Sequence, residues 1–244
     1  MKTMIYAHRG ASVFHPENTL EAFSLAVEQG VDGIELDVHL SKDGEIVVAH
    51  DERLERVSNG KGYINDRTLD ELKSLNFDNS FFGGRTCRIP LLSEVFSLLK
   101  PTNITANIEL KTTERLYPEL PKKLLDLAEK NAMKNRIIYS SFNHYSLKQL
   151  KSLDSGAKIG LLYESGMVDP WVYAKYLGAD AINPHYYIIA ALPEIVERCH
   201  EHGVAVNVWT VDDPQAIKSM LKNGVDGIIT NRPDIAVASR NSFK

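Results

Sequence analysis

Acidic and basic residues stand inside two apolar segments of the sequence, two positions apart in each. Glu35 and Asp37 alternate with apolar residues in 34–38, and Glu109 and Lys111 repeat this arrangement in 108–111. Side chains two apart on a β-strand point to the same face, so each pair projects to one side. Because an unpaired buried carboxylate is strongly destabilising, these groups need partners or a cation. Three carboxylates near one lysine predict a site for a hard divalent ion, Mg²⁺ or Ca²⁺; a structural ion-pair network is the alternative.

Two histidines and an arginine follow other apolar runs. His8 and Arg9 end the run that begins at residue 4, and His50 follows the run 46–49. Histidine can move protons near neutral pH, and arginine can bind phosphate through two parallel hydrogen bonds. Two histidines on opposite sides of a phosphorus atom would supply a general base and a general acid. The alternatives are a structural role for His8, and a turn at His50 with Asp51 capping the next segment.

The sequence predicts no chemistry for most other histidines. His39 is expected to alternate away from the face of Glu35 and Asp37 and to lie outside the site. Surface or loop positions are expected for His15, His144, His200 and His202.

A recurring unit accounts for the positions of these residues. A helix-like segment ends at a glycine and a short apolar strand follows, at Gly30, Gly156, Gly178, Gly203 and Gly224. Glycine suits the left-handed position just past a helix C-terminus. Apolar runs without strict alternation are typical of parallel strands covered on both faces.

Eight alternating strand and helix units favour a closed (β/α)₈ barrel, the TIM barrel, over an open doubly wound sheet. Strands are predicted at 4–8, 32–38, 104–110, 136–141, 157–162, 180–183, 204–209 and 225–230. Helices are predicted near 18–30, 91–100, 118–131, 144–154, 171–178, 190–202, 213–223 and 233–240. No Gly-x-Gly-x-x-Gly turn follows the first strand, as a dinucleotide-binding sheet would require. In such barrels the reactive groups lie at the C-terminal ends of the strands, where the charged residues above are found.

We expect residues 1–244 to form a single domain. The polar, glycine-containing stretch from about 51 to 90 interrupts the alternation of strands and helices, between the second strand and its helix. Glu45 to His50 are predicted to form a short extra strand, and 51–90 an insertion over the C-terminal mouth of the barrel. A stretch of this length rarely forms a core alone.

Composition excludes several classes of partner. The net charge is −4 and no basic face is evident, so nucleic acid is not an expected partner. No apolar stretch reaches the roughly 18 residues of a membrane span, and no stable membrane association is expected. Cys87 and Cys199 lack metal-ligand spacing. With no room for a signal peptide before the first strand, we expect a cytoplasmic enzyme with a small-molecule substrate; the oligomeric state is not predicted.

A series of short motifs resembles one known family over roughly residues 4 to 235. The motifs are Ala7-His8-Arg9-Gly10, Pro16-Glu17-Asn18-Thr19, Gly33-Ile34-Glu35-Leu36-Asp37-Val38, Lys42-Asp43-Gly44, His50-Asp51, Ile108-Glu109-Leu110-Lys111, Val208-Trp209-Thr210-Val211 and Gly227-Ile228-Ile229-Thr230. In this order they resemble the glycerophosphodiester phosphodiesterase family. The resemblance implies metal-dependent hydrolysis of glycerophosphodiesters to sn-glycerol 3-phosphate and an alcohol.

The resemblance also implies a role for each site residue. Glu35, Asp37 and Glu109 would bind the metal, and His8 and His50 would be the acid–base pair. Arg9 and Lys111 would bind the phosphate, Glu17 and Asn18 would open the first helix and brace the site, and Trp209 would line the substrate pocket unless it is a core aromatic. Asn231 stands where many members have aspartate, and no role follows for it. His185 has no family counterpart; we expect it at the mouth, where it would affect the choice of head group.

Two other functions remain open. One is a phosphodiesterase acting on lysophospholipid or phosphatidylinositol head groups, although the chain lacks an obvious amphipathic docking helix or basic rim. The other is a non-catalytic barrel that binds phosphorylated polyols. Residue identity does not decide whether the nucleophile is the glycerol 2-hydroxyl, which would give a cyclic phosphate, or water.

Overall fold

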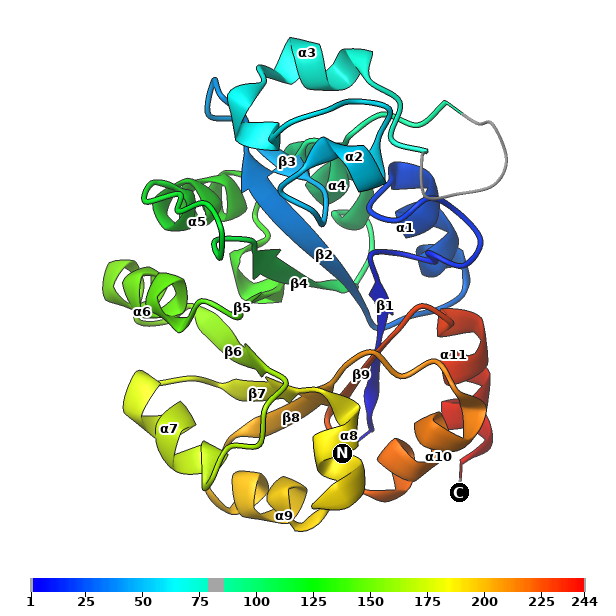
Figure 1. Cartoon of the computed structure of the whole chain (residues 1–244). Helices are drawn as coiled ribbons and strands as arrows, with labels where there is room; N and C mark the ends of the chain where they lie inside the picture. The colour runs from blue at the N-terminus through cyan, green and yellow to red at the C-terminus, as the bar shows by residue number, and fades with distance from the viewer. Residues whose placement is uncertain (1, 79–85, 244) are drawn as a thin grey trace.

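Eight parallel strands close into a barrel. The computed structural model describes residues 2–78 and 86–243. The barrel strands are β1 (Met4–His8), β2 (Gly33–Leu40), β4 (Thr105–Leu110), β5 (Ile137–Ser141), β6 (Lys158–Tyr163), β7 (Ala181–Pro184), β8 (Ala205–Val208) and β9 (Gly227–Thr230). They neighbour one another in chain order, and β1 pairs with both β2 and β9, which closes the sheet (Figure 1). The predicted (β/α)₈ fold is confirmed, with each strand within two residues of its predicted ends.

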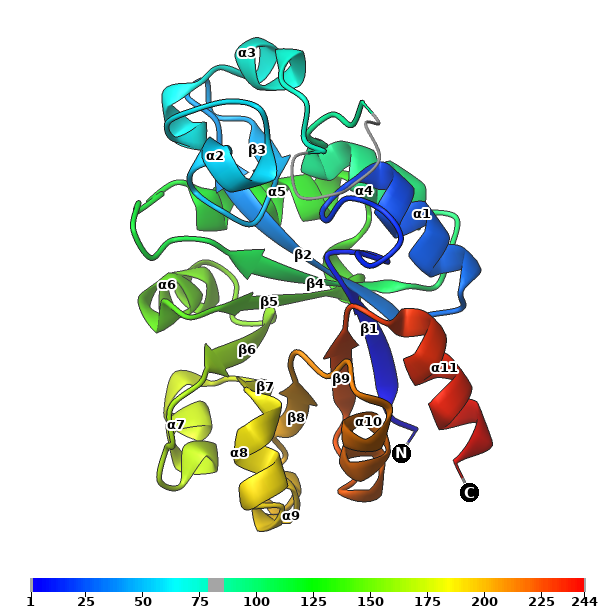
Figure 2. The same cartoon turned by 45° about the vertical axis from the view of Figure 1, so that its right-hand side comes forward.

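Helices surround the strands on the outside (Figure 2). They are α1 (Leu20–Glu28), α4 (Leu92–Leu99), α5 (Leu120–Lys130), α6 (His144–Leu153), α7 (Pro170–Leu177), α8 (Tyr186–Ala191), α9 (Glu194–Glu201), α10 (Pro214–Lys222) and α11 (Pro233–Ser242), with a 3₁₀ turn η2 (Lys134–Arg136). Because helices cover the outer face and side chains fill the interior, all eight residues of β2 are buried. None of the helices in the described ranges is both long and apolar enough to cross a membrane.

The prediction of a left-handed glycine just past the end of a helix is confirmed at four of the five positions. Gly30, Gly178, Gly203 and Gly224 follow helices with φ between 67° and 76°, the left-handed region that glycine adopts without strain. The prediction is wrong for Gly156, whose φ lies outside that region. There the backbone N–H of Gly156 donates to Oδ1 of Asp154, and this local turn ends the helix instead.

The predicted single helix at 190–202 is wrong. The structure has two helices there, α8 and α9, separated at Leu192 and Pro193. Leu192 has φ −134° and ψ 67°, because the proline ring disfavours helical backbone in the preceding residue.

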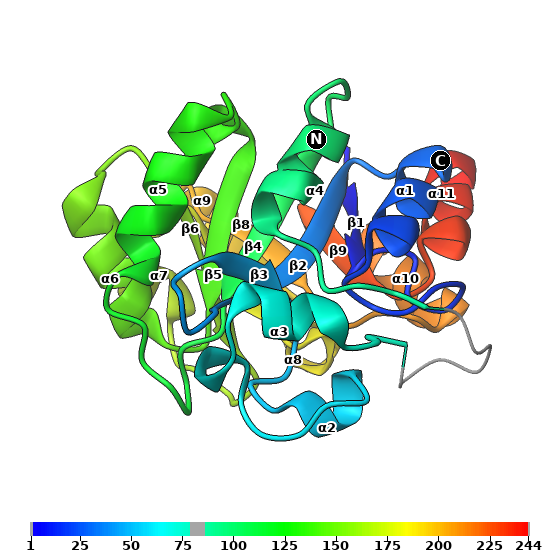
Figure 3. The ribbon, with the colours of Figure 1, turned by 90° about the horizontal axis from the view of Figure 1, so that it is seen from above.

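The insertion between β2 and its helix α4 has a small core of its own. The predicted extra strand is β3 (Ile46–Val48), which runs antiparallel to the end of β2. After it come α2 (Leu54–Val57), the 3₁₀ turn η1 (Ile64–Asp66) and α3 (Leu69–Ser74), which the sequence did not predict. Leu54, Ile64 and Leu72 are fully buried in a cluster separate from the barrel core. These segments lie together beyond the end of β2 (Figures 1 and 3); residues 79–85 of the predicted insertion lie outside the described residues.

Candidate active site

Three carboxylates meet at the C-terminal ends of two adjacent strands. Asp37 of β2 is in register with Glu109 of β4, and Glu35 lies two residues before Asp37. One oxygen of each carboxylate lies within 4.8 Å of the others, and the residues are 4%, 0% and 8% exposed for Glu35, Asp37 and Glu109. The sequence spacing predicted that Glu35 and Asp37 share one face of a strand. The parallel register of β2 and β4 brings Glu109 beside them.

The cluster is electrostatically unbalanced. Burial, together with the charges of Asp37 and Glu109, raises the pKa of Glu35 well above its ordinary range. Burial also raises the pKa of Glu109, although Lys111 opposes this. For Asp37, the charges of His50, Arg9 and Lys111 outweigh burial and hold the pKa below its ordinary range. The site therefore concentrates negative charge that the described cations only partly neutralise.

Two cations flank the carboxylates. Nζ of Lys111 lies 2.9 Å from Oε1 of Glu109 and 3.8 Å from Oδ1 of Asp37. Nε of Arg9 lies 3.5 Å from Oδ2 of Asp37, and its backbone N–H donates to Oε2 of Glu35 at 3.1 Å. Arg9 adopts φ 57° between β1 and Gly10, which aims its guanidinium back toward β2. Both cations lie within reach of an anion held at the carboxylate cluster.

The two predicted histidines face this cluster, and each is held through Nδ1. Nδ1 of His8 lies 2.7 Å from Oδ1 of Asn231, while Nε2 lies 3.9 Å from Oε2 of Glu35. Nδ1 of His50 lies 2.5 Å from Oδ1 of Asp51, and Nε2 lies 3.1 Å from Nζ of Lys111. Burial and the neighbouring charge of Arg9 lower the pKa of His8 to about 4.

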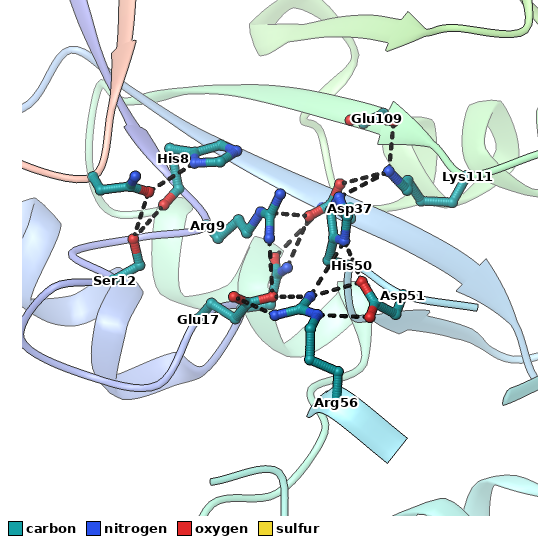
Figure 4. Close-up of polar contacts among 12 residues, drawn as sticks. His8, Arg9, Ser12, Glu17, Asp37, His50, Asp51, Arg56, Glu109 and Lys111 are labelled. Carbon is teal, nitrogen blue, oxygen red and sulfur yellow. Dashed lines mark hydrogen bonds and ion pairs between the residues drawn. The ribbon is translucent and has the colours of Figure 1, made fainter. Parts of the chain in front are cut away.

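Glu17 and Asn18 lie behind the site, in the loop that leads into α1. Asn18 is buried with φ 57°, and its Nδ2 donates to Oδ2 of Asp37 at 2.9 Å. Oε1 of Glu17 accepts a 3.1 Å hydrogen bond from Nη1 of Arg9 (Figure 4). The loop thus holds one predicted metal ligand and one predicted phosphate-binding side chain.

One cavity brings both histidines, Arg9 and two of the three carboxylates together with an apolar wall. Its lining is His8, Arg9, Glu35, His50, Asn107, Glu109, Ser140, Phe142, Leu162, Trp209, Thr210 and Ile229. Trp209 is part of the wall: its Nε1 donates to the carbonyl of Asn183 at 2.8 Å, and its ring meets Phe142 edge-on at 5.4 Å. Trp209 is therefore at the cavity rather than wholly in the core. His185 packs edge-on against Trp209 at 5.0 Å, behind the cavity lining.

The prediction that His39 points away from the face of Glu35 and Asp37 is wrong. Residues two apart share a face, so His39 belongs with Glu35 and Asp37 on β2. It is fully buried, and Nε2 lies 3.2 Å from the backbone carbonyl of His50, with Nδ1 3.3 Å from the hydroxyl of Tyr117. His39 thus holds the backbone at His50 without lining the cavity.

Sequence reasoning missed the side chains that orient the two histidines. Nδ2 of Asn231 donates to Oδ2 of Asp212 at 2.7 Å, which turns the amide oxygen of Asn231 toward His8. Asp51 contacts His50, and Arg56 of α2 contacts Asp51. Asp51 could have been noticed from its place beside His50, but nothing in the sequence relates Arg56 to the site.

Comparison with known proteins gives one consistent result. Residues 8–235 match the model of the "Glycerophosphoryl diester phosphodiesterase family". A glycerophosphodiester phosphodiesterase of Caldanaerobacter subterraneus subsp. tengcongensis is 46% identical over 240 residues, 97% of each chain. One from Bacillus altitudinis is 38% identical, over 99% of this chain and 100% of its own.

Solved structures agree. An Oleispira antarctica phosphodiesterase, solved in complex with the product sn-glycerol-3-phosphate, is similar with a TM-score of 0.90 and 26% identity, over 99% of this chain and 98% of that one. A glycerophosphodiester phosphodiesterase from Agrobacterium tumefaciens is similar with a TM-score of 0.84 and 29% identity, over 97% and 99%.

Proposed function

The chain belongs to the glycerophosphoryl diester phosphodiesterase family, and we propose that it hydrolyses glycerophosphodiesters to sn-glycerol 3-phosphate and an alcohol. The observation that carries the proposal is one cavity in which buried carboxylates, two imidazoles and an arginine face one another. Relatives with the same name and a similar phosphodiesterase that binds sn-glycerol-3-phosphate support it.

The carboxylates fit a divalent cation. Oδ1 of Asp37 is buried and accepts no hydrogen bond from any residue in the described ranges, and Glu35 is held beside two other acids. Carboxylate oxygens are the donors that Mg²⁺ and Ca²⁺ prefer, so Glu35, Asp37 and Glu109 would hold either ion. When bound, the ion would supply positive charge beside the nonbridging oxygens of the phosphate.

Arg9 and Lys111 are our candidates for binding the phosphate. Both are already held by carboxylates, Arg9 by Glu17 and Asp37 and Lys111 by Glu109. Donors that are fixed before the substrate arrives need no reorganisation as charge develops, so they stabilise the transition state more than free side chains would.

His8 and His50 are our candidates for the proton transfers. With each Nδ1 engaged by Asn231 or Asp51, Nε2 is the ring atom left to face the substrate. The lowered pKa of His8 makes it neutral at pH 7, the form that can accept a proton. One imidazole removes the proton of the attacking hydroxyl and the other protonates the departing alkoxide. The attacking hydroxyl is that of glycerol, followed by hydrolysis of a cyclic phosphate, or that of water.

Release of sn-glycerol 3-phosphate from defined substrates tests this function. The purified protein is treated with a chelator and assayed for sn-glycerol 3-phosphate from glycerophosphocholine and glycerophosphoethanolamine, with Mg²⁺ and Ca²⁺ added back separately. We expect release that depends on added ion. Faster turnover of lysophosphatidylcholine vesicles would favour the head-group phosphodiesterase, and ion-dependent binding without product would favour the non-catalytic barrel.

A further inference from the structure

Arg56 joins two carboxylates that contact different residues of the candidate active site. Its Nε and Nη2 donate to the two oxygens of Asp51 at 2.6 and 2.7 Å. Its Nη1 and Nη2 donate to the two oxygens of Glu17 at 3.0 and 2.8 Å. One planar guanidinium therefore binds both carboxylates with two hydrogen bonds each, a geometry that a lysine ammonium cannot reproduce.

Each of these carboxylates contacts a residue of the proposed chemistry. Asp51 lies 2.5 Å from Nδ1 of His50, and Glu17 lies 3.1 Å from Nη1 of Arg9. Figure 4 shows the guanidinium of Arg56 between Glu17 and Asp51, with Arg9 above Glu17 and His50 above the guanidinium. The contacts thus run from His50 through Asp51, Arg56 and Glu17 to Arg9, and Nη2 of Arg56 also lies 3.3 Å from Nδ1 of His50.

The fold gives Arg56 this position through the insertion. It lies on α2, whose neighbours Leu54 and Val57 are buried in the separate core of the insertion. Asp51 follows β3, and Glu17 precedes α1, so the three residues come from different parts of the chain. Packing of the insertion core therefore determines where the guanidinium stands.

We propose that Arg56 is a positioning residue that acts through Asp51 to fix the imidazole of His50 for proton transfer. The inference rests on the proposed function. Asp51 accepts the Nδ1 proton of His50 and leaves Nε2 toward the substrate, which is the role an acid plays behind a catalytic histidine. Arg56 holds both oxygens of Asp51, so the carboxylate cannot turn away. Through Glu17 it links the same insertion to Arg9.

A simple surface ion pair is the competing explanation. The side chain of Arg56 is 44% exposed, and exposed ion pairs contribute little to stability. That explanation predicts a small change in melting temperature and no change in turnover. The positioning role predicts a loss of turnover that depends on Asp51.

The test is a double-mutant cycle on glycerophosphocholine at saturating metal. Arg56→Met and Asp51→Asn are each expected to lower kcat by about 10- to 100-fold, the range for residues that orient functional side chains, with KM changed less than about threefold. Arg56→Lys should not restore kcat, because it cannot bind both carboxylates in pairs. If Arg56 acts through Asp51, the double variant should be no more than about threefold slower than the slower single variant.

Arg67→Met is the matched control. Arg67 lies in the same insertion, is 46% exposed and pairs only loosely with Glu71 at 3.9 Å. Its kcat should stay within about twofold of the wild type. Equal kcat for wild type and Arg56→Met, or losses that multiply in the double variant, would overturn the inference. If Arg56→Met does not fold, Arg56→Lys and Asp51→Asn complete the same cycle. An inactive wild type would overturn the proposed function and this inference together.

Discussion

The side-chain amide of Asn18 donates a 2.9 Å hydrogen bond to Oδ2 of Asp37, the most buried of the three clustered carboxylates. Its other amide atom, Oδ1, accepts from the backbone N–H of Asp37 at 3.4 Å. Asn18 therefore sets the rotation of this carboxylate and leaves Oδ1 of Asp37 facing the cluster.

We predict that Asn18→Gly weakens metal binding by about 10- to 100-fold, because the carboxylate loses the donor that orients it. Glycine is chosen because Asn18 has φ 57°, which glycine adopts without strain. Isothermal titration with Mg²⁺ and Ca²⁺ measures the effect. Ala132→Gly, at φ 58° and remote from the site, is the control and should bind metal normally. Unchanged affinity in Asn18→Gly would rule out this role.

His8→Ala and His50→Ala should each lower turnover by about 10²- to 10⁴-fold, the usual contribution of general acid–base catalysis. Steady-state release of glycerol phosphate measures it. His202→Ala removes an imidazole that stacks on Trp171 instead, and it should leave turnover unchanged. Near-normal turnover in either site variant removes that histidine from the mechanism.

Glu35→Gln should raise the melting temperature of the metal-free protein. In the folded state the pKa of Glu35 is raised above its ordinary 4.5. The stability that the protonated Glu35 contributes is therefore fully present below pH 4.5. It is lost as the pH rises through the folded-state pKa, because the buried carboxylate then ionises. The increase in melting temperature should therefore be small near pH 5 and larger near pH 8. In a chain of this size it is about 2–4 °C for each kcal/mol of added stability.

With saturating Mg²⁺ or Ca²⁺ the same substitution should lower the melting temperature, because a metal ligand is lost. Glu28→Gln, on the exposed side of α1, should change neither value. A metal-free Glu35→Gln protein that melts below the wild type at pH 8 would contradict the unbalanced charge of the cluster.

Gly10→Ala should destabilise the fold by about 2–5 kcal/mol, the sum of left-handed strain and overpacking. Gly10 has φ 85°, and an added Cβ would meet the backbone and Cβ of Ala22 at 2.7 Å. Gly30→Ala tests strain alone, since Gly30 has φ 76° and nothing within 4 Å. Urea unfolding should show the larger loss at Gly10; equal losses would mean that α1 shifts to make room.

The sequence predicted what depends on strand periodicity. Glu35 and Asp37 share a face because side chains alternate, and apolar runs with helices between them predicted the barrel. The same rule was misapplied to His39, which was assigned to the opposite face although residues two apart on a strand share a face. The convergence of the predicted site residues also followed, because parallel strands end at one edge of the sheet.

Contacts that depend on the path of an irregular segment could not be predicted. Arg56 meets Glu17 and Asp51 only because the insertion folds on its own core, which leaves no periodic pattern. Asn231 was left without a role because its amide is oriented by Asp212, a neighbour in space and not in a recognisable motif. Short helices such as α2 carry too few residues for a helical pattern to be seen.

Pairing of β1 with β9 has a consequence during protein synthesis. His8 is 223 residues upstream of its partner Asn231, so it leaves the ribosome well before that partner has been made. The contact that holds His8 can therefore form only after β9 has been synthesised. In the proposed mechanism, proton transfer by His8 would therefore require that the last strand of the barrel is in place.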